Sequence, residues 1–200
     1  MAPLLRRSGL LLGGCVILGI GVGFLLGANL GSDGYSTLVN GVALSLDLEF
    51  WIANLAIGVL FVALAATRKV FPGVGTVVQV LLVGVTVSVA LDVLGCPEEL
   101  ATRVVFLAIA FPVLALGIAT YLGSQTGAGP AEAAALAWDP PVPFRWTYSA
   151  VQGGGALIGW LLGATVGLGT VAVILLLGPL VDVLAGALHL DVHQGTSDEA

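Results

Sequence analysis

The residues of this sequence that could do chemistry are a few polar side chains set in long apolar runs. Four of them are amides: Asn29, Gln79, Gln125 and Gln152. A polar group inside a membrane is costly, so each amide is a functional candidate by default. Together they could line one polar cavity, whereas each alone could make an interhelical hydrogen bond instead.

Acidic and histidine side chains are the other candidates. Glu132 opens a short apolar stretch, and Asp182 follows a Gly-Pro pair, where a kink could turn its carboxylate inward. His189 and His193 are spaced like two metal ligands on one helix face. A catalytic zinc site needs a third protein ligand and an enclosing shell, so we expect no metal site.

No enzyme constellation is present in the sequence. It contains no HExxH motif, no nucleophile elbow with partners, no phosphate-binding loop and no CxxC pair. Its two cysteines, Cys15 and Cys96, give no disulfide framework and are expected to be free thiols. We therefore expect a protein that is not an enzyme and binds no cofactor.

The composition indicates which elements must hold these side chains. Of the 200 residues, 58% are hydrophobic and 9% are charged, and the mean hydropathy is +1.09. A soluble domain carries about 25% charged residues, so this chain is suited to facing lipid instead of water. The net charge of −6 and the single lysine, Lys69, argue against nucleic-acid binding, which needs a basic patch.

Charged residues divide the chain into apolar runs long enough to span a membrane. The predicted spans are residues 8–32, 50–67, 70–91 and 103–123, with two more inside 146–181 joined by a turn at 163–167. Five spans remain if that last pair is a single helix. We expect an all-α, polytopic membrane helix bundle that forms one domain over residues 1–200 and ends in a short polar tail, 189–200.

The basic residues predict the orientation of the bundle, because Lys and Arg mark the cytoplasmic side. With the N-terminus inside the cell, five of the six basic residues lie inside and only Arg103 lies outside. The sequence thus predicts a multi-pass protein of the plasma membrane with both termini in the cytoplasm.

The two halves of the chain resemble each other. Residues 73–84 and 167–178 are identical at seven of twelve positions, at a spacing of 94, and a second block matches at a spacing of 96. Each half, about 8–95 and 103–188, holds three spans. Because three is odd, the halves form an inverted repeat, which is typical of secondary transporters with midplane substrate sites. A scaffold built by duplication is the alternative.

Each half also contains an apolar stretch too short to span, residues 34–44 and 130–138. Asp33 precedes the first stretch and Pro130 begins the second, which is helix-start chemistry. We expect two short helices that either dip into the protein or lie along the membrane surface. The N-terminus of a dipping helix would offer an anion site.

Glycines mark the expected hinges and close helix contacts. Gly19, Gly23 and Gly27 recur every four residues on one helical face. The full set of predicted hinge and packing glycines is Gly27, Gly31, Gly73, Gly75, Gly123, Gly127, Gly167 and Gly169.

The block from Gly159 to Val181, with a Gly-x-x-x-Gly hinge followed by Gly-x-Gly-Thr-Val, resembles the YczE/YyaS/YitT-like bacterial and archaeal membrane proteins. The resemblance extends from about Arg7 to Leu188 and implies a multi-span fold with little defined biochemistry. Where that pattern has acidic residues, this chain has Ser36 and Gln152. The resemblance adds Ser36 to the candidates and leaves Glu132 as the remaining acid, which weakens a proton-coupled mechanism.

The sequence as a whole predicts a small-solute transporter or permease; the alternative is a non-transporting accessory or regulatory membrane protein. The expected partners are the lipid bilayer, an unknown small solute, and a second copy of the chain or another membrane protein. The candidate residues for the substrate cavity are Asn29, Ser36, Gln125, Glu132, Gln152 and Asp182.

Overall fold

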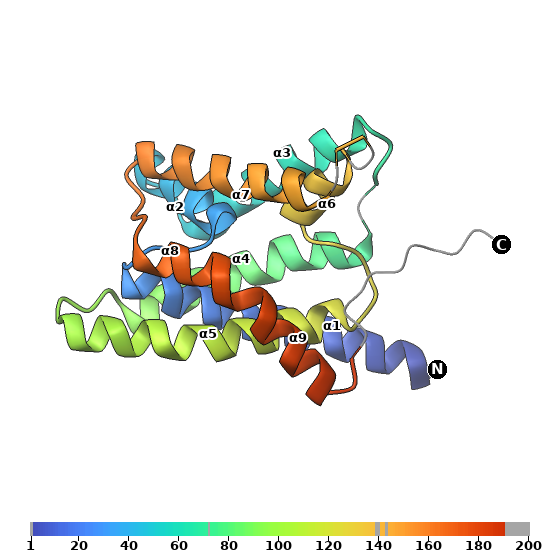
Figure 1. Ribbon diagram of the computed structural model, residues 1–200, viewed down its shortest axis with the longest axis horizontal. Helices are drawn as coiled ribbons and strands as arrows, with labels where there is room; N and C mark the ends of the chain where they lie inside the picture. The colour runs from blue at the N-terminus through green and yellow to red at the C-terminus, as the bar shows by residue number, and fades with distance from the viewer. Residues whose placement is uncertain (1, 72, 139–140, 143, 191–200) are drawn as a thin grey trace.

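The computed structural model describes residues 2–71, 73–138, 141–142 and 144–190, and within these ranges every regular element is a helix (Figure 1). The elements are α1 (Ala2–Ala28), α2 (Gly34–Leu46), α3 (Phe50–Ala66), α4 (Val74–Leu94), α5 (Leu100–Leu122), α6 (Pro130–Leu136), α7 (Phe144–Leu161), α8 (Leu168–Ala172), the π-helix η1 (Val173–Leu177) and α9 (Gly178–Ala187). The all-helical prediction is confirmed for the described residues.

Four of the helical segments are long and apolar enough to cross a membrane: Leu4–Ala28, Val74–Leu94, Leu100–Leu122 and Leu168–Ala187. The apolar helix α3 is shorter, at 17 residues. A helix lies at each of the six predicted span positions, and a turn separates α7 from α8 where the glycine-bounded turn was expected. The long apolar helices indicate a membrane-embedded protein.

The helices pack in two groups. Figure 1 shows α2, α3, α6 and α7 on one side of the molecule and α1, α5 and α9 on the other. Helix α1 packs along α5, α2 packs along α7, and α4 contacts both α1 and α3, so α4 joins the two groups. The main apolar core, which includes Leu25, Val39 and Val87, therefore draws on helices from both groups.

Glycines let α1 approach its neighbours closely. A Cβ atom added at Gly19 would lie 2.6 Å from the Thr86 Cβ, and one at Gly23 would lie 2.5 Å from the Ala90 Cβ. Both neighbours belong to α4. One added at Gly117 of α5 would lie 2.5 Å from the Leu18 backbone nitrogen. A side chain at any of these three positions would clash, so the glycines are sites of close helix packing.

The last apolar segment is broken by a π-helical turn, η1, directly before Pro179. Proline has no N–H and its ring crowds the preceding turn, so the regular helical hydrogen bonds cannot continue through it. The irregular backbone expected at the Gly-Pro pair is present. The side chain of Asp182, which follows it, lies outside the described part of the structure.

The two short apolar stretches are helices, α2 and α6. Helix α2 is largely buried up to Ala43 and exposed at Leu44, Ser45 and Leu46. Asp33 is the N-cap of α2, and Pro130 occupies the first turn of α6, as the helix-start chemistry predicted. The 7 residues of α6 include four alanines, which have the highest helix propensity. Most residues of α6 are buried.

Candidate functional site

The start of α2 presents a carboxylate to the protein interior. The Asp33 side chain accepts a hydrogen bond from the Ser36 backbone N–H at 3.0 Å, which satisfies one of the unpaired donors at the helix start. Ser36 is buried, whereas the Asp33 side chain is half-buried. Desolvation by the surrounding protein raises the Asp33 pKa, and the Ser36 hydrogen bond opposes that rise.

Helix α2 meets α7 without side chains between them. A Cβ atom added at Gly155 of α7 would lie 2.5 Å from the Gly34 carbonyl oxygen. This close approach brings the Tyr35 backbone N–H to 3.0 Å from the Gln152 Oε1, to which it donates. The Gln152 Nε2 in turn donates to the Tyr148 hydroxyl at 2.8 Å. Gln152 thus links the start of α2 to Tyr148, which lies one turn before Gln152 in α7.

Glu132 from α6 completes this hydrogen-bonded chain. The Tyr148 hydroxyl is hydrogen-bonded to the Glu132 carboxyl. Burial is the main cause that raises the Glu132 pKa, and the negative charge of Asp33 raises it further, while hydrogen bonds from the Glu132 backbone and Tyr148 oppose the rise. The two carboxyls are therefore close enough to repel one another, although 99 residues separate them in the sequence.

Gln79 from α4 lies next to the same carboxyl. A Cβ atom added at Gly129 would meet both the Glu132 Oε2 and, at 2.6 Å, the Gln79 Oε1. The Gln79 Oε1 is buried and has no hydrogen-bond partner among the described residues. A buried carbonyl oxygen without a donor is unfavourable, so this atom favours a ligand that can donate a hydrogen bond or carry positive charge.

The Tyr35 side chain extends the network toward α3 and α4. Its hydroxyl donates to the Asn54 Oδ1 at 3.1 Å, and the Asn54 Nδ2 donates to the Val80 carbonyl oxygen at 2.6 Å. Asn54 is therefore fully engaged as a structural support. We call the set Asp33, Tyr35, Gln79, Glu132, Tyr148 and Gln152 the polar cluster.

The polar cluster can take up positive charge. Among the described residues, no Lys, Arg or His side chain contributes to the pKa shift of Asp33 or Glu132. A carboxyl in a poorly solvated place without a basic neighbour is stabilised by taking up a proton or by a bound cation. Both residues are intermediate in exposure. Proton uptake and cation binding are thus the chemistry that this arrangement supports.

The anion site expected at the starts of the short helices is not open. The backbone N–H of Ser36 is taken by the chain's own Asp33, and Glu132 occupies the first turn of α6. The chain supplies its own negative charge at both helix starts. An external anion would be repelled there, so this expectation was wrong.

Of the residues predicted to line one cavity, the structure brings only some together. Glu132 and Gln152 are in the polar cluster, and Ser36 supports Asp33 through its backbone. Asn29 lies elsewhere: its side chain accepts a hydrogen bond from Thr165, and its carbonyl oxygen accepts one from Arg103.

Asn29 and Gln125 lie at opposite ends of α1. Asn29 follows the last residue of that helix, whereas Gln125 lines a pocket with Arg6 and Arg7 near its first residues. At 1.5 Å rise per residue, about 33 Å separates these two ends. The two amides therefore do not share a cavity, contrary to the prediction.

The sequence-based prediction missed Asp33, Tyr35 and Tyr148 as members of the site. Asp33 was interpreted only as a helix start, and aromatic residues in an apolar chain resemble ordinary packing or interfacial residues. The available signal was the i, i+4 spacing of Tyr148 and Gln152, which places both on one helix face. No group of three metal-ligating side chains occurs in the described ranges.

A comparison with known protein families gives a match over most of the chain. The profile of a family of unknown function, DUF6198, matches residues 5–186. The chain belongs to this family. The match includes α1 to α9 almost completely and every member of the polar cluster.

One relative of this DUF6198 chain is an uncharacterized protein of Haemophilus influenzae. The two are 27% identical over 157 residues, which are 78% of this chain and 72% of the relative. No solved structure matches the chain. The comparisons thus give the family, whose function is unknown, and the chemistry must be argued from the polar cluster.

Proposed function

We propose that the protein is a membrane transporter for a small solute, with the polar cluster as its binding site and with no catalytic activity. The observation that carries this proposal is the chain of hydrogen bonds that links the Tyr35 N–H through Gln152 and Tyr148 to the Glu132 carboxyl inside an otherwise apolar helical protein. Keeping ionisable groups at such a place is costly, so they indicate a functional role.

The proposal includes an inverted-repeat architecture, supported by two matching hydrogen bonds. The Gly75 N–H donates to the Thr126 carbonyl oxygen at 3.0 Å, and the Gly169 N–H donates to the Leu30 carbonyl oxygen at 2.8 Å. Gly169 follows Gly75 by 94 residues, and Thr126 follows Leu30 by 96, which are the spacings of the two sequence blocks. Each half thus contributes the donor of one bond and the acceptor of the other.

Backbone conformation gives a second line of support. Of the nine described residues with positive φ, eight form pairs at the same two spacings, and Asp47 is the ninth. The pairs are Asn29 with Gln125, Gly31 with Gly127, Lys69 with Gly163, and Gly95 with His189. Such conformations are uncommon outside glycine, so their recurrence at a constant spacing favours two copies of one fold. In this proposal six helices span the membrane as two inverted units of three, and α2 and α6 are the non-spanning helix of each unit. The relationship to the YczE/YyaS/YitT-like proteins is part of the same proposal.

The proposed orientation has both termini in the cytoplasm of a cell whose plasma membrane holds the protein. Arg6, Arg7 and His189 line one pocket, so the start of α1 and the end of α9 lie at the same end of the bundle. Arg103 lies at the other end, where its Nε donates to the Ala28 carbonyl oxygen at 2.8 Å. This separation of the basic residues supports the orientation.

A non-transporting accessory protein, alone or as a homo-oligomer, is the second candidate function. The observation that favours it is the complete pairing of several predicted cavity residues. The Gln152 side chain bonds to Tyr35 and Tyr148, and the Asn29 side chain bonds to Thr165. Pairing of this kind also stabilises a static bundle, so uptake measurements must decide between the two candidates.

The deciding experiment is uptake into liposomes that contain the purified protein. The panel includes cationic, neutral polar and anionic solutes, each with and without an imposed proton gradient. We expect uptake of a cationic or neutral polar solute above the level of empty liposomes. Glu132→Gln should reduce this uptake to the empty-liposome level, because it removes the carboxyl that interacts with both Tyr148 and Asp33.

The matched control is Glu98→Gln, the same chemical change at an exposed position in the loop between α4 and α5. It should transport like the wild type. If no solute enters faster than in empty liposomes, or if Glu132→Gln transports as well as Glu98→Gln, the transporter proposal is refuted and the accessory role is favoured.

A further inference from the structure

A second polar site lies at the end of the bundle formed by the start of α1. It is a pocket of about 350 Å³ lined by the side chains of Arg6, Arg7, Gln125 and His189, with Leu10 and Leu190 as its apolar part. This volume is at the lower end of the range of small-molecule sites, roughly 300–1,000 Å³. The pocket is separate from the polar cluster and is not explained by the proposed transport site.

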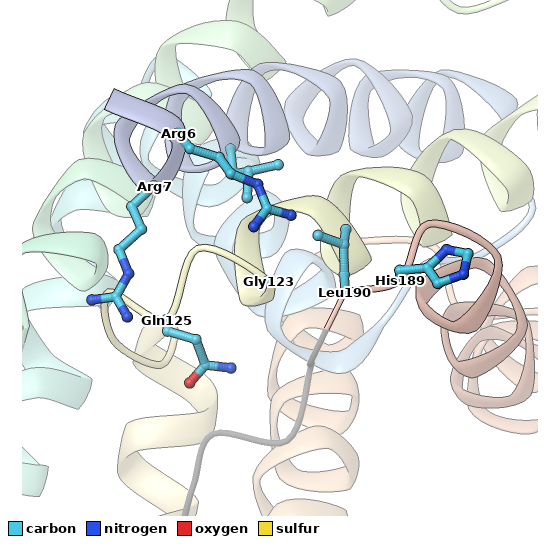
Figure 2. A pocket seen from close by; sticks show the side chains of 7 residues that line it. Arg6, Arg7, Gly123, Gln125, His189 and Leu190 are labelled. Atoms are coloured by element: carbon cyan, nitrogen blue, oxygen red, sulfur yellow. The ribbon is translucent and has the colours of Figure 1, made fainter. Parts of the chain in front are cut away.

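The charge of this pocket is positive. Two guanidinium groups line it, and no acidic side chain of the described residues does so. Figure 2 shows Arg6 and Arg7 extending from α1 toward the loop that holds Gly123 and Gln125, with His189 and Leu190 on the other side. Guanidinium groups are suitable donors for the oxygens of a phosphate group.

The position of the pocket indicates where such a phosphate would come from. Arg6 and Arg7 lie near the start of the candidate span Leu4–Ala28, Gln125 follows the span Leu100–Leu122, and His189 follows the span Leu168–Ala187. The ends of three candidate spans therefore surround the pocket, at the depth of the lipid headgroups. Leu4 and Leu5, which precede Arg6 in α1, are exposed and can contact acyl chains.

We propose that this pocket binds the phosphate group of an anionic phospholipid. Basic pockets between transmembrane helices on the cytoplasmic side are suited to anionic headgroups, and each Arg near the surface adds to the attraction. The two guanidiniums contact the phosphate oxygens, while Leu10 and Leu190 contact the apolar part of the lipid.

The test is a binding titration of the purified full chain in neutral detergent. The ligands are short-chain phosphatidylglycerol, short-chain phosphatidylcholine and inorganic phosphate. We expect phosphatidylglycerol to bind more tightly than phosphatidylcholine. Arg6→Gln and Arg7→Gln should each weaken its binding about fivefold, and the double variant roughly thirtyfold.

The matched control is Lys69→Gln, which removes one positive charge from an exposed residue that does not line the pocket. It should bind phosphatidylglycerol as the wild type does. Equal melting temperatures of all variants without lipid establish that a loss of binding is not a loss of folding.

Two kinds of result would overturn the proposal, either a failure to recognise the anionic lipid or recognition of soluble phosphate in its place. Equal affinity for both lipids, or equal affinity of the Arg variants and Lys69→Gln, means that the pocket does not recognise an anionic headgroup. Arg-dependent binding of inorganic phosphate without any preference for phosphatidylglycerol means that the source is soluble phosphate and not lipid. Neither result depends on whether the protein transports a solute.

Discussion

Replacing Gly155 with alanine tests the contact between α2 and α7 that holds the polar cluster together. The added Cβ atom would lie 2.5 Å from the Gly34 carbonyl oxygen, whereas ordinary contacts begin at 3.4 Å. The two backbones must therefore separate locally by about 0.9 Å, the difference between these distances. The hydrogen bond from the Tyr35 N–H to the Gln152 Oε1, now 3.0 Å, would then be too long to persist.

The magnitude follows from three contributions. Overpacking of a close contact costs about 1–3 kcal/mol, and the lost hydrogen bond costs about 1 kcal/mol. Alanine in place of glycine inside a helix stabilises the folded state by about 1 kcal/mol, because alanine has the higher helix propensity. The net destabilisation is about 1–3 kcal/mol, which lowers the melting temperature of a 200-residue chain by roughly 2–12 °C.

The control is two residues away in the same helix. A Cβ atom added at Gly153 has no neighbour within 4 Å, so Gly153→Ala gains the helix propensity without a clash. We expect its melting temperature in detergent to rise by about 2–4 °C. The two variants should thus shift the thermal unfolding of the protein in opposite directions. If Gly155→Ala stabilises the protein as much as Gly153→Ala does, α2 does not pack on α7 in this way.

Two further predictions concern titration and topology. The Glu132 pKa is raised above its ordinary 4.5, so the folded state holds the proton at pH values where the unfolded state has lost it, and stability falls as pH rises above about 4.5. Glu132→Gln should remove part of this decline in a series of melting temperatures, and parallel curves for variant and wild type would contradict the raised pKa. Cys96 is exposed and Cys15 is buried, so a membrane-impermeant maleimide should label Cys96 alone, from outside the cell. Labelling only in inside-out vesicles would reverse the proposed orientation, and Cys96→Ser is the control.

The helices and their starts could be predicted from sequence because both depend on local chemistry. Apolar runs between charged residues predicted a helix at each of six positions, and four of the described helices there are long and apolar enough to span a membrane. Asp33 and Pro130 predicted the starts of α2 and α6. Which polar residues meet could not be predicted in the same way. Tyr35 and Gln152 are 117 residues apart, and their contact depends on how closely two glycine-containing backbones pack.

Asn29 and Gln125 show why two residues at equivalent positions of the proposed repeat need not lie close together in space. The two residues have the same left-handed conformation, with φ of 50° and 54°. Asn29 directly follows α1, and Gln125 lies three residues after the end of α5. If the halves are inverted, equivalent helix ends lie on opposite sides of the membrane. Two residues at equivalent positions are then expected to lie far apart. Equivalent residues can contact each other only where they lie close to the pseudo-two-fold axis.

The positions of Asp33 and Glu132 limit the kind of solute that the proposed site can accept. Both carboxyls are at the start of a short helix, where the backbone N–H groups and the helix dipole stabilise negative charge. The protein's own carboxyls thus occupy the N-terminal turns of α2 and α6, where an external anion would otherwise bind. The Gln79 Oε1, which has no hydrogen-bond partner among the described residues, adds another acceptor next to Glu132. A site built from acceptors, without a basic side chain among its described members, favours protons, cations and neutral hydrogen-bond donors over anions. In the liposome panel, uptake of an anion that still requires Glu132 would contradict this conclusion.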